Sequence, residues 1–188
     1  MKILRFPKLP RTPVLLSLLL VLLCAQAGAQ SFYWETPKVL VPDKARFPVA
    51  DSGGDLVAVV WQEVESRPEG GGRIYLSIQT SRDFRSWRRN DRFIGPLPYE
   101  EQEVQLYSMA VDGTGTIYLA VAAGARQTEL YRSSDDGRSF TLLSTIEAGS
   151  AALAPGISLT DGGNILLFVT QEQGNSLFIY YTVSTNGR

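Results

Sequence analysis

The sequence contains no histidine and only one cysteine, Cys24, among its 188 residues. The absence of histidine excludes Ser-His-Asp and Cys-His nucleophile systems and any metal site built from imidazole. Because Cys24 lies in an apolar leader, the rest of the chain has no thiol nucleophile, no thiolate ligand and no internal disulfide. Only two methionines occur, whereas 17 glycines, 10 prolines, eight tyrosines and eight phenylalanines favour short strands and turns over packed helices.

The first 29 residues have the pattern of a secretory signal peptide. Basic residues precede an apolar run of about eleven residues, and Ala27-Gly28-Ala29 supplies a small-x-small cleavage signal. The run is shorter than the roughly 20 residues that cross a bilayer, so we expect no stable membrane span. We expect cleavage near Ala29 and a secreted, periplasmic or cell-surface protein. Lipoprotein processing at Cys24 is the alternative, although Leu22-Leu23 matches such sites poorly.

The remaining residues, 30–188, are expected to form one domain. Removing the leader leaves 14 basic against 19 acidic residues, a net charge of −5, which together with export disfavours a nucleic-acid partner. The densest basic cluster comprises Arg82, Arg85, Arg88, Arg89 and Arg92. Acidic residues are interspersed among these arginines, and we interpret the cluster as the charged side of an outer strand that faces water.

A period of about fifty residues runs through this domain. Residues 47–63, 107–123 and 155–172 each read as a short strand, an Asp-Gly-rich turn and a strongly apolar strand. A third alternating strand follows at residues 73–80, 128–133 and 176–183, and each runs into a polar turn. Units of this length are typical of propeller blades, which need neighbours to bury their faces.

The spacing therefore predicts an all-β fold, a partial β-propeller of about three blades built from antiparallel three- to four-stranded sheets. Propellers close with four to eight blades, so we expect the chain to be the N-terminal part of a longer one. The alternative is a ring completed by two three-blade copies that associate through their open edges. In either case we expect apolar surface to be left exposed at the terminal blades.

The turn at residues 133–140 matches the pattern S-x-D-x-G-x-[ST]-[WF] at every specified position, namely Ser133, Asp135, Gly137, Ser139 and Phe140. The hydroxyl and carboxylate groups can accept hydrogen bonds from the turn's own amides, and the aromatic ring can pack between sheets. The first copy, around Asp83 and Trp87, is one residue shorter and fits S-x-D-[LF]-x-x-W. When Trp87 is aligned with Phe140, Arg82 takes the place of Asp135.

This pattern resembles the Asp-box of the sialidase-like, BNR-repeat propellers. In that family the Asp-box lies away from the substrate pocket, so the resemblance implies a structural role for Asp83, Asp135 and Asp136. It also implies that Arg46, in Arg46-Phe47-Pro48, takes the place of an arginine that grips a substrate carboxylate. A guanidinium suits that task because its planar fork bonds both oxygens.

Further candidates for substrate binding are Arg67, as a second arginine, and Glu69, in place of the family's acid/base aspartate, since no aspartate occurs between Asp55 and Asp83. The structural alternative for Arg46 is that Arg-Phe-Pro merely begins an edge strand. Catalytic residues remain unknown, because the tyrosines, among them Tyr107 and Tyr131, lie in alternating strands where packing is the usual role. Trp61 is likewise expected to make a core contact.

No cofactor is expected, and no metal site, since the Asp-Gly turns have hairpin spacing rather than the order of calcium ligands. Three functions remain open. The first is an exported BNR-repeat protein that binds glycans or other extracellular ligands. The second is an exo-sialidase or related glycoside hydrolase, for which the expected Tyr-Glu pair and third arginine are missing. The third is a protein-interaction scaffold that uses its open propeller edges.

Overall fold

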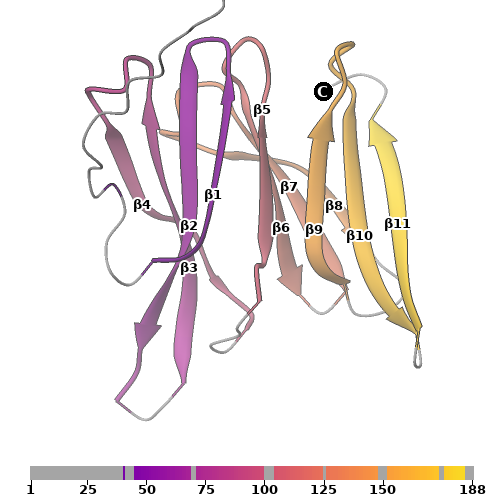
Figure 1. The fold of residues 1–188 in the computed structure, drawn as a ribbon. Helices are drawn as coiled ribbons and strands as arrows, with labels where there is room; N and C mark the ends of the chain where they lie inside the picture. The colour runs from indigo at the N-terminus through magenta and orange to yellow at the C-terminus, as the bar shows by residue number, and fades with distance from the viewer. Residues whose placement is uncertain are drawn as a thin grey trace, which may run out of the picture. The chain divides into compact units, whose positions relative to one another are not determined.

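The computed structural model describes residues 40, 45–68, 71–99, 104–124, 126–147, 152–173 and 176–184. The predicted signal peptide, Cys24 and Glu69 lie outside these residues. Within them the chain forms eleven β-strands in three antiparallel sheets (Figure 1) and no helix. The all-β fold and the sheets of three to four strands that the repeat predicts are therefore confirmed.

The strands follow one another in each sheet in chain order. Sheet A contains β1 (Ala45–Gly53), β2 (Leu56–Ser66), β3 (Gly72–Ser81) and β4 (Arg88–Leu97). Sheet B contains β5 (Tyr107–Val111), β6 (Ile117–Gly124), β7 (Gln127–Ser133) and β8 (Thr141–Glu147). Sheet C contains β9 (Ala152–Leu159), β10 (Ile165–Gln173) and β11 (Ser176–Ser184).

Each sheet is a blade of the predicted type, in which the second strand is the most apolar and lies between two partners. Glycines at positive φ form the tight hairpins between the first two strands, for example Gly54 at φ 59° and Gly115 at φ 83°. β1, β5 and β9, the first strands of the three sheets, lie next to one another. Short polar turns join the third strand to the fourth in sheets A and B.

The joints between the sheets are rows of buried aliphatic side chains. Alternate residues of β2 and β3 in sheet A, among them Val60 and Leu76, pack against Met109 and Leu119 of sheet B. The opposite face of sheet B, through Ala120, packs on β10 of sheet C. This alternation explains why β6 is buried along almost its whole length, since both of its faces meet a neighbouring sheet.

Buried polar groups pin the segment that leads from sheet A to sheet B. The Gln62 side chain is fully buried; its Oε1 accepts a hydrogen bond from the Leu106 amide at 2.8 Å, and its Nε2 donates to the Val104 carbonyl at 3.4 Å. The Tyr107 hydroxyl lies at hydrogen-bond distance from the carbonyl oxygens of Phe47 and Val60. These bonds fix where sheet B begins relative to β1 and β2.

The first strands are also joined through side chain to main chain hydrogen bonds. Between β1 and β5, the Asp51 carboxylate accepts a hydrogen bond from the Val111 amide at 2.7 Å. Between β5 and β9, the Ser108 hydroxyl accepts a hydrogen bond from the Ile157 amide at 3.3 Å. At the tip of the first hairpin the backbone of sheet A touches that of sheet B. A Cβ on Gly53 would overlap the Asp112 carbonyl oxygen and lie 2.7 Å from the carbonyl oxygen of Val111.

We therefore expect Gly53→Ala to weaken the joint between sheets A and B. A methyl group there has to displace backbone atoms, so the free energy of unfolding should fall by about 1–3 kcal/mol. Urea denaturation measures this change. Gly113→Ala is the matched control, because a Cβ on Gly113 meets no atom within 4 Å. Equal effects of the two substitutions would contradict the close approach at Gly53.

Candidate functional site

The turn between β7 and β8 is built around the Asp135 carboxylate. Its Oδ1 accepts hydrogen bonds from the Ser133 hydroxyl at 2.8 Å and the Ser139 amide at 3.0 Å, and its Oδ2 accepts the Ser139 hydroxyl at 2.6 Å. The Ser139 hydroxyl is the largest cause that lowers the pKa of Asp135 to about 2. Gly137, at φ 76°, donates its amide to the Ser133 hydroxyl.

The turn between β3 and β4 is likewise built around an aspartate carboxylate that accepts hydrogen bonds from its own turn. The Asp83 Oδ1 accepts hydrogen bonds from the Ser86 amide at 2.7 Å, the Arg85 amide at 2.8 Å and the Ser81 hydroxyl at 3.1 Å. The two amides lower the pKa of Asp83 to about 2. Asp83 and Asp135 are therefore equivalent. The alignment that set Arg82 against Asp135 is wrong, because the residue missing from the first turn falls after its aspartate.

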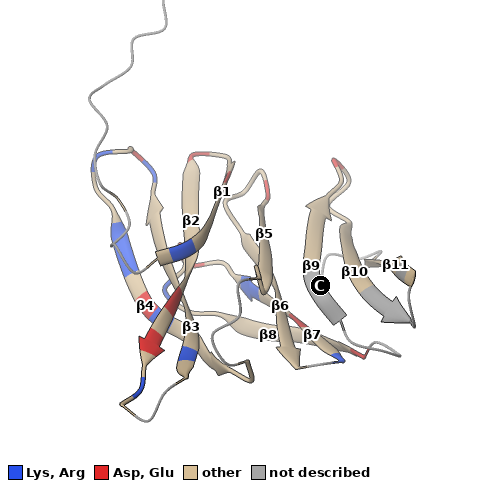
Figure 2. Ribbon diagram, turned by 60° about the horizontal axis from the view of Figure 1, so that its bottom comes forward, with Lys and Arg blue, Asp and Glu red and all other residues tan. Residues whose placement is uncertain are grey.

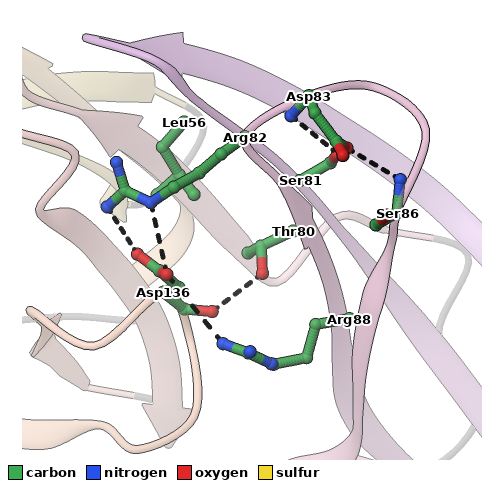
Figure 3. Close-up of a pocket in the computed structure, with 8 residues that line it drawn as sticks. All are labelled: Leu56, Thr80, Ser81, Arg82, Asp83, Ser86, Arg88 and Asp136. Carbon is green, nitrogen blue, oxygen red and sulfur yellow. Dashed lines mark hydrogen bonds and ion pairs between the residues drawn. The ribbon is translucent and has the colours of Figure 1, made fainter.

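Asp136 points away from its own turn and toward sheet A (Figure 3). Its carboxylate accepts hydrogen bonds from Arg82 Nη2 at 2.7 Å and Arg82 Nε at 3.3 Å, and Arg88 Nη1 lies 3.9 Å away. Arg82 also pairs with Asp55, in the turn between β1 and β2. The contact with Arg82 is the main cause that lowers the pKa of the Asp136 carboxyl.

Arg82, Arg88 and Asp136 line an open pocket of about 230 Å³ where the two polar turns meet. Further contacts close the same joint. The Thr80 hydroxyl donates to the Asp136 carbonyl at 2.8 Å, and Asn90 Nδ2 lies 3.0 Å from the carbonyl oxygen of Gly137. The Phe140 ring stacks on Phe93 of β4, with centroids 4.4 Å apart. These ion pairs, hydrogen bonds and the stacked Phe93 and Phe140 rings hold sheets A and B together, and we call this set of contacts the clasp.

A second charged cluster lies on β2 and β4 of sheet A, whose acidic and basic residues are coloured in Figure 2. Its β2 members, Glu63 and Glu65, alternate with Val60 and Val64, which pack in the core shared with sheet B. Trp61 is completely buried in this cluster; its Nε1 donates to Glu63 at 3.1 Å, and the Arg89 guanidinium lies 5.4 Å from its ring centroid. Arg92 bonds Glu65 Oε1 at 2.9 Å and lies over the Tyr75 ring. The arginines of β4 are exposed to water but paired, as the interpretation of an outer strand predicts.

The predicted ligand-binding arginines lie at the other end of sheet A from the clasp. Arg46 stands near the start of β1, seven residues before Gly53, and pairs in register with the buried Gln62. Arg67 is exposed just past the end of β2, where its amide donates to the Gly71 carbonyl. Gln62, the register partner of Arg46, and Arg67 are five positions apart, about 16 Å in an extended strand, so the two arginines do not lie side by side.

The tyrosines considered as nucleophiles have structural surroundings. Tyr107 is fully buried and bonded to main-chain carbonyls, and burial raises its pKa. Burial, with the hydrogen bond that its hydroxyl donates to Glu129, raises the pKa of Tyr131. A raised pKa disfavours the phenolate that attacks as a nucleophile. Tyr180 and Tyr181 lie in β11 on exposed parts of sheet C.

The described residues contain no cluster of three or more acidic side chains that could hold a metal ion. No helix among them is long and apolar enough to cross a bilayer.

Comparisons with known proteins add information on the fold. No protein-family model matches the sequence, and no curated protein matches it either. A solved structure of a protein of unknown function from Dyadobacter fermentans DSM 18053 is similar, with a TM-score of 0.54 and 16% identity over 77% of this chain and 52% of that one. The chain thus spans about half the length of that protein. This likeness concerns the fold alone.

A Hadza microbial sialidase is also similar, with a TM-score of 0.40 and 13% identity over 72% of this chain and 30% of the sialidase. That degree of likeness carries no argument about activity.

The Asp135 carboxylate should make stability depend on pH in the acid range. Its pKa is about 2 in the folded chain against an ordinary value near 3.8, so the unfolded chain takes up the proton first as pH falls. Its contribution is present above about pH 4 and is lost as the pH falls toward 2. Urea denaturation of the parent and of Asp135→Asn should show a deficit on the order of 1 kcal/mol at pH 7 that narrows below pH 4.

The exposed Asp161, in the turn between β9 and β10, provides the control substitution Asp161→Asn. We expect it to lower the free energy of unfolding at pH 7 much less than Asp135→Asn does. An Asp135→Asn deficit that stays constant from pH 7 to pH 2 would contradict the assigned hydrogen bonds.

Proposed function

We propose that this chain is part of an exported, sialidase-like propeller protein that binds glycans or other extracellular ligands at the end of the blades that carries Arg46. The proposal combines the resemblance of the turn at residues 133–140 to an Asp-box with the position of the two arginines. The clasp occupies the opposite end of sheets A and B, where Asp55, Arg82 and Asp136 neutralise one another.

The observation that carries the proposal is the place of Arg46 at the beginning of the first strand, on the same face of sheet A as Gln62. A guanidinium held near such a strand end can donate two hydrogen bonds to a carboxylate or sulfate group. Arg67 lies further along the same end, on the exposed β2–β3 loop. A ligand that meets both arginines is therefore an acidic oligosaccharide rather than a single sugar acid.

The Arg46→Ala substitution tests this function on a glycan array that includes sialylated and sulfated oligosaccharides. Because a hydrogen bond to a charged group is worth about 1.5–3 kcal/mol, binding should weaken roughly tenfold or more. Arg85→Ala is the matched control. It removes the same charge from an exposed position in the turn between β3 and β4, and it leaves the Arg85 amide bonded to Asp83.

Binding by the parent that survives Arg46→Ala unchanged would remove Arg46 from the site. A parent protein that retains no glycan would contradict the proposed ligand class. A fluorogenic sialoside measured alongside distinguishes binding from hydrolysis, since turnover by the parent would support the glycoside hydrolase instead.

A further inference from the structure

The hairpin tips of sheets A and B touch, whereas those of sheets B and C are separated by a cavity. Between sheets A and B, a Cβ on Gly53 would overlap the Asp112 carbonyl oxygen. In the β5–β6 and β9–β10 turns, by contrast, a Cβ on Gly113 or Gly163 would meet no atom within 4 Å. The cavity lined by these two turns has a volume of about 530 Å³. It is therefore as large as a small-molecule pocket, for which about 300–1,000 Å³ is usual.

Tyr118 of β6 brings an unpartnered hydroxyl to the wall of this cavity. The side chain is only 5% exposed and belongs to the same buried cluster as Ile165 of sheet C. Burial and the charge of Asp112 raise the pKa of its hydroxyl, and no hydrogen bond to a described residue contributes. Buried tyrosine hydroxyls usually have a hydrogen-bond partner. A buried hydroxyl without one at a cavity wall indicates a place where a ligand supplies the partner.

The two turns add further hydrogen-bonding groups on either side of the cavity. Asp112 accepts the Thr114 amide through Oδ1, which fixes the carboxylate and leaves Oδ2 as an acceptor among the described contacts. On the sheet C side, the Thr160 hydroxyl accepts the Asn164 amide and keeps its own proton for donation. The carboxylate of Asp161 is exposed beside it. The cavity thus combines two carboxylate acceptors with two hydroxyl donors.

The charge and polarity of the cavity restrict the ligand. Its described wall carries two carboxylates and no lysine or arginine, so an anionic group is repelled. The two carboxylates belong to no cluster of three or more acidic side chains among the described residues, and they fall short of the oxygen-rich shell of a calcium ion. The Tyr118 ring, Val111 and Leu159 add apolar surface. A sugar ring, which has an apolar C–H face and hydroxyl groups at its edges, matches this combination.

We propose that the cavity between the β5–β6 and β9–β10 turns binds a neutral, hydroxyl-rich ligand, of which a hexose unit is the simplest form. The Asp112 and Asp161 carboxylates accept hydrogen bonds from its hydroxyls, and the Tyr118 hydroxyl donates to one of its oxygens. This site is separate from the acidic-glycan site proposed at Arg46. Seven positions of β1, roughly 23 Å of extended strand, separate Arg46 from Gly53, which touches Asp112 at the cavity.

NMR titration of the isotope-labelled full chain with methyl β-D-glucopyranoside, methyl β-D-galactopyranoside and methyl α-D-mannopyranoside tests the site. At least one of these neutral glycosides should shift the amide signals of Gly113 and Gly163. Tyr118→Phe removes a hydroxyl that the fold does not bond, so the urea midpoint should stay the same while the affinity falls about three- to tenfold. Arg46→Ala is the control and should leave this affinity unchanged, which separates the site from the acidic-glycan site.

Gly113→Trp gives a second readout that does not depend on one hydrogen bond. A Cβ at Gly113 meets no atom within 4 Å, so the indole can be accommodated at the cavity and should abolish glycoside binding. Arg85→Trp, in the exposed β3–β4 turn, is the matched control and should bind as the parent does.

Four results would overturn the proposal. They are the absence of shifts with all three glycosides, an unchanged affinity in Tyr118→Phe, binding by Gly113→Trp as tight as that of the parent, and a lower urea midpoint in Tyr118→Phe, which would show that the hydroxyl is used within the fold. Tetramethylammonium and N-acetylneuraminate serve as cationic and anionic probes. Shifts of the Gly113 and Gly163 amides with either of these in place of the glycosides would overturn the assigned ligand class.

Discussion

The fold depends on the burial of aliphatic rows between neighbouring sheets. A sheet of three or four strands cannot cover its own faces, so its stability comes from the sheet beside it. Sheets A and B share one such row and sheets B and C another, so β6 of sheet B is covered on both faces. The glycine contact at Gly53 and the buried Gln62 matter because they let these rows approach and hold them in register.

The polar turns complete the joint that the aliphatic rows begin. Two neighbouring aspartates have different partners. Asp135 accepts hydrogen bonds from the amides and hydroxyls of its own turn, whereas Asp136 forms an ion pair with Arg82 of the preceding sheet. The Phe140 ring then stacks on Phe93 of that sheet. The carboxylates and the aromatic ring of this turn are thus already bonded or stacked within the protein. For this reason a structural role fits the turn better than a catalytic one.

Features that depend on neighbouring residues could be predicted from the sequence. The Asp-Gly hairpins, the third strands and the bonding of Asp83 and Asp135 follow from spacing within one module. Contacts between residues of different blades could not be predicted, because no local sequence pattern encodes which blades pack together. Asp136 meets an arginine 54 positions away, and Trp61 lies beneath the charges of β4 rather than against another sheet. The separation of Arg46 from Arg67 likewise follows from how far the β2–β3 hairpin extends past β1.

The two terminal faces of the three-sheet unit are chemically different, and this asymmetry goes against the expectation of apolar surface at both ends. On sheet A, arginines and glutamates of β2 and β4 cover Trp61 and keep that face hydrated. On sheet C, Phe168 of β10 and Ile179 and Tyr181 of β11 are exposed, and β11 contains no charged residue. Because burial costs charged groups their hydration, whereas burial of apolar groups lowers the free energy, covering the described apolar side chains of sheet C is more favourable than covering the ion pairs of sheet A.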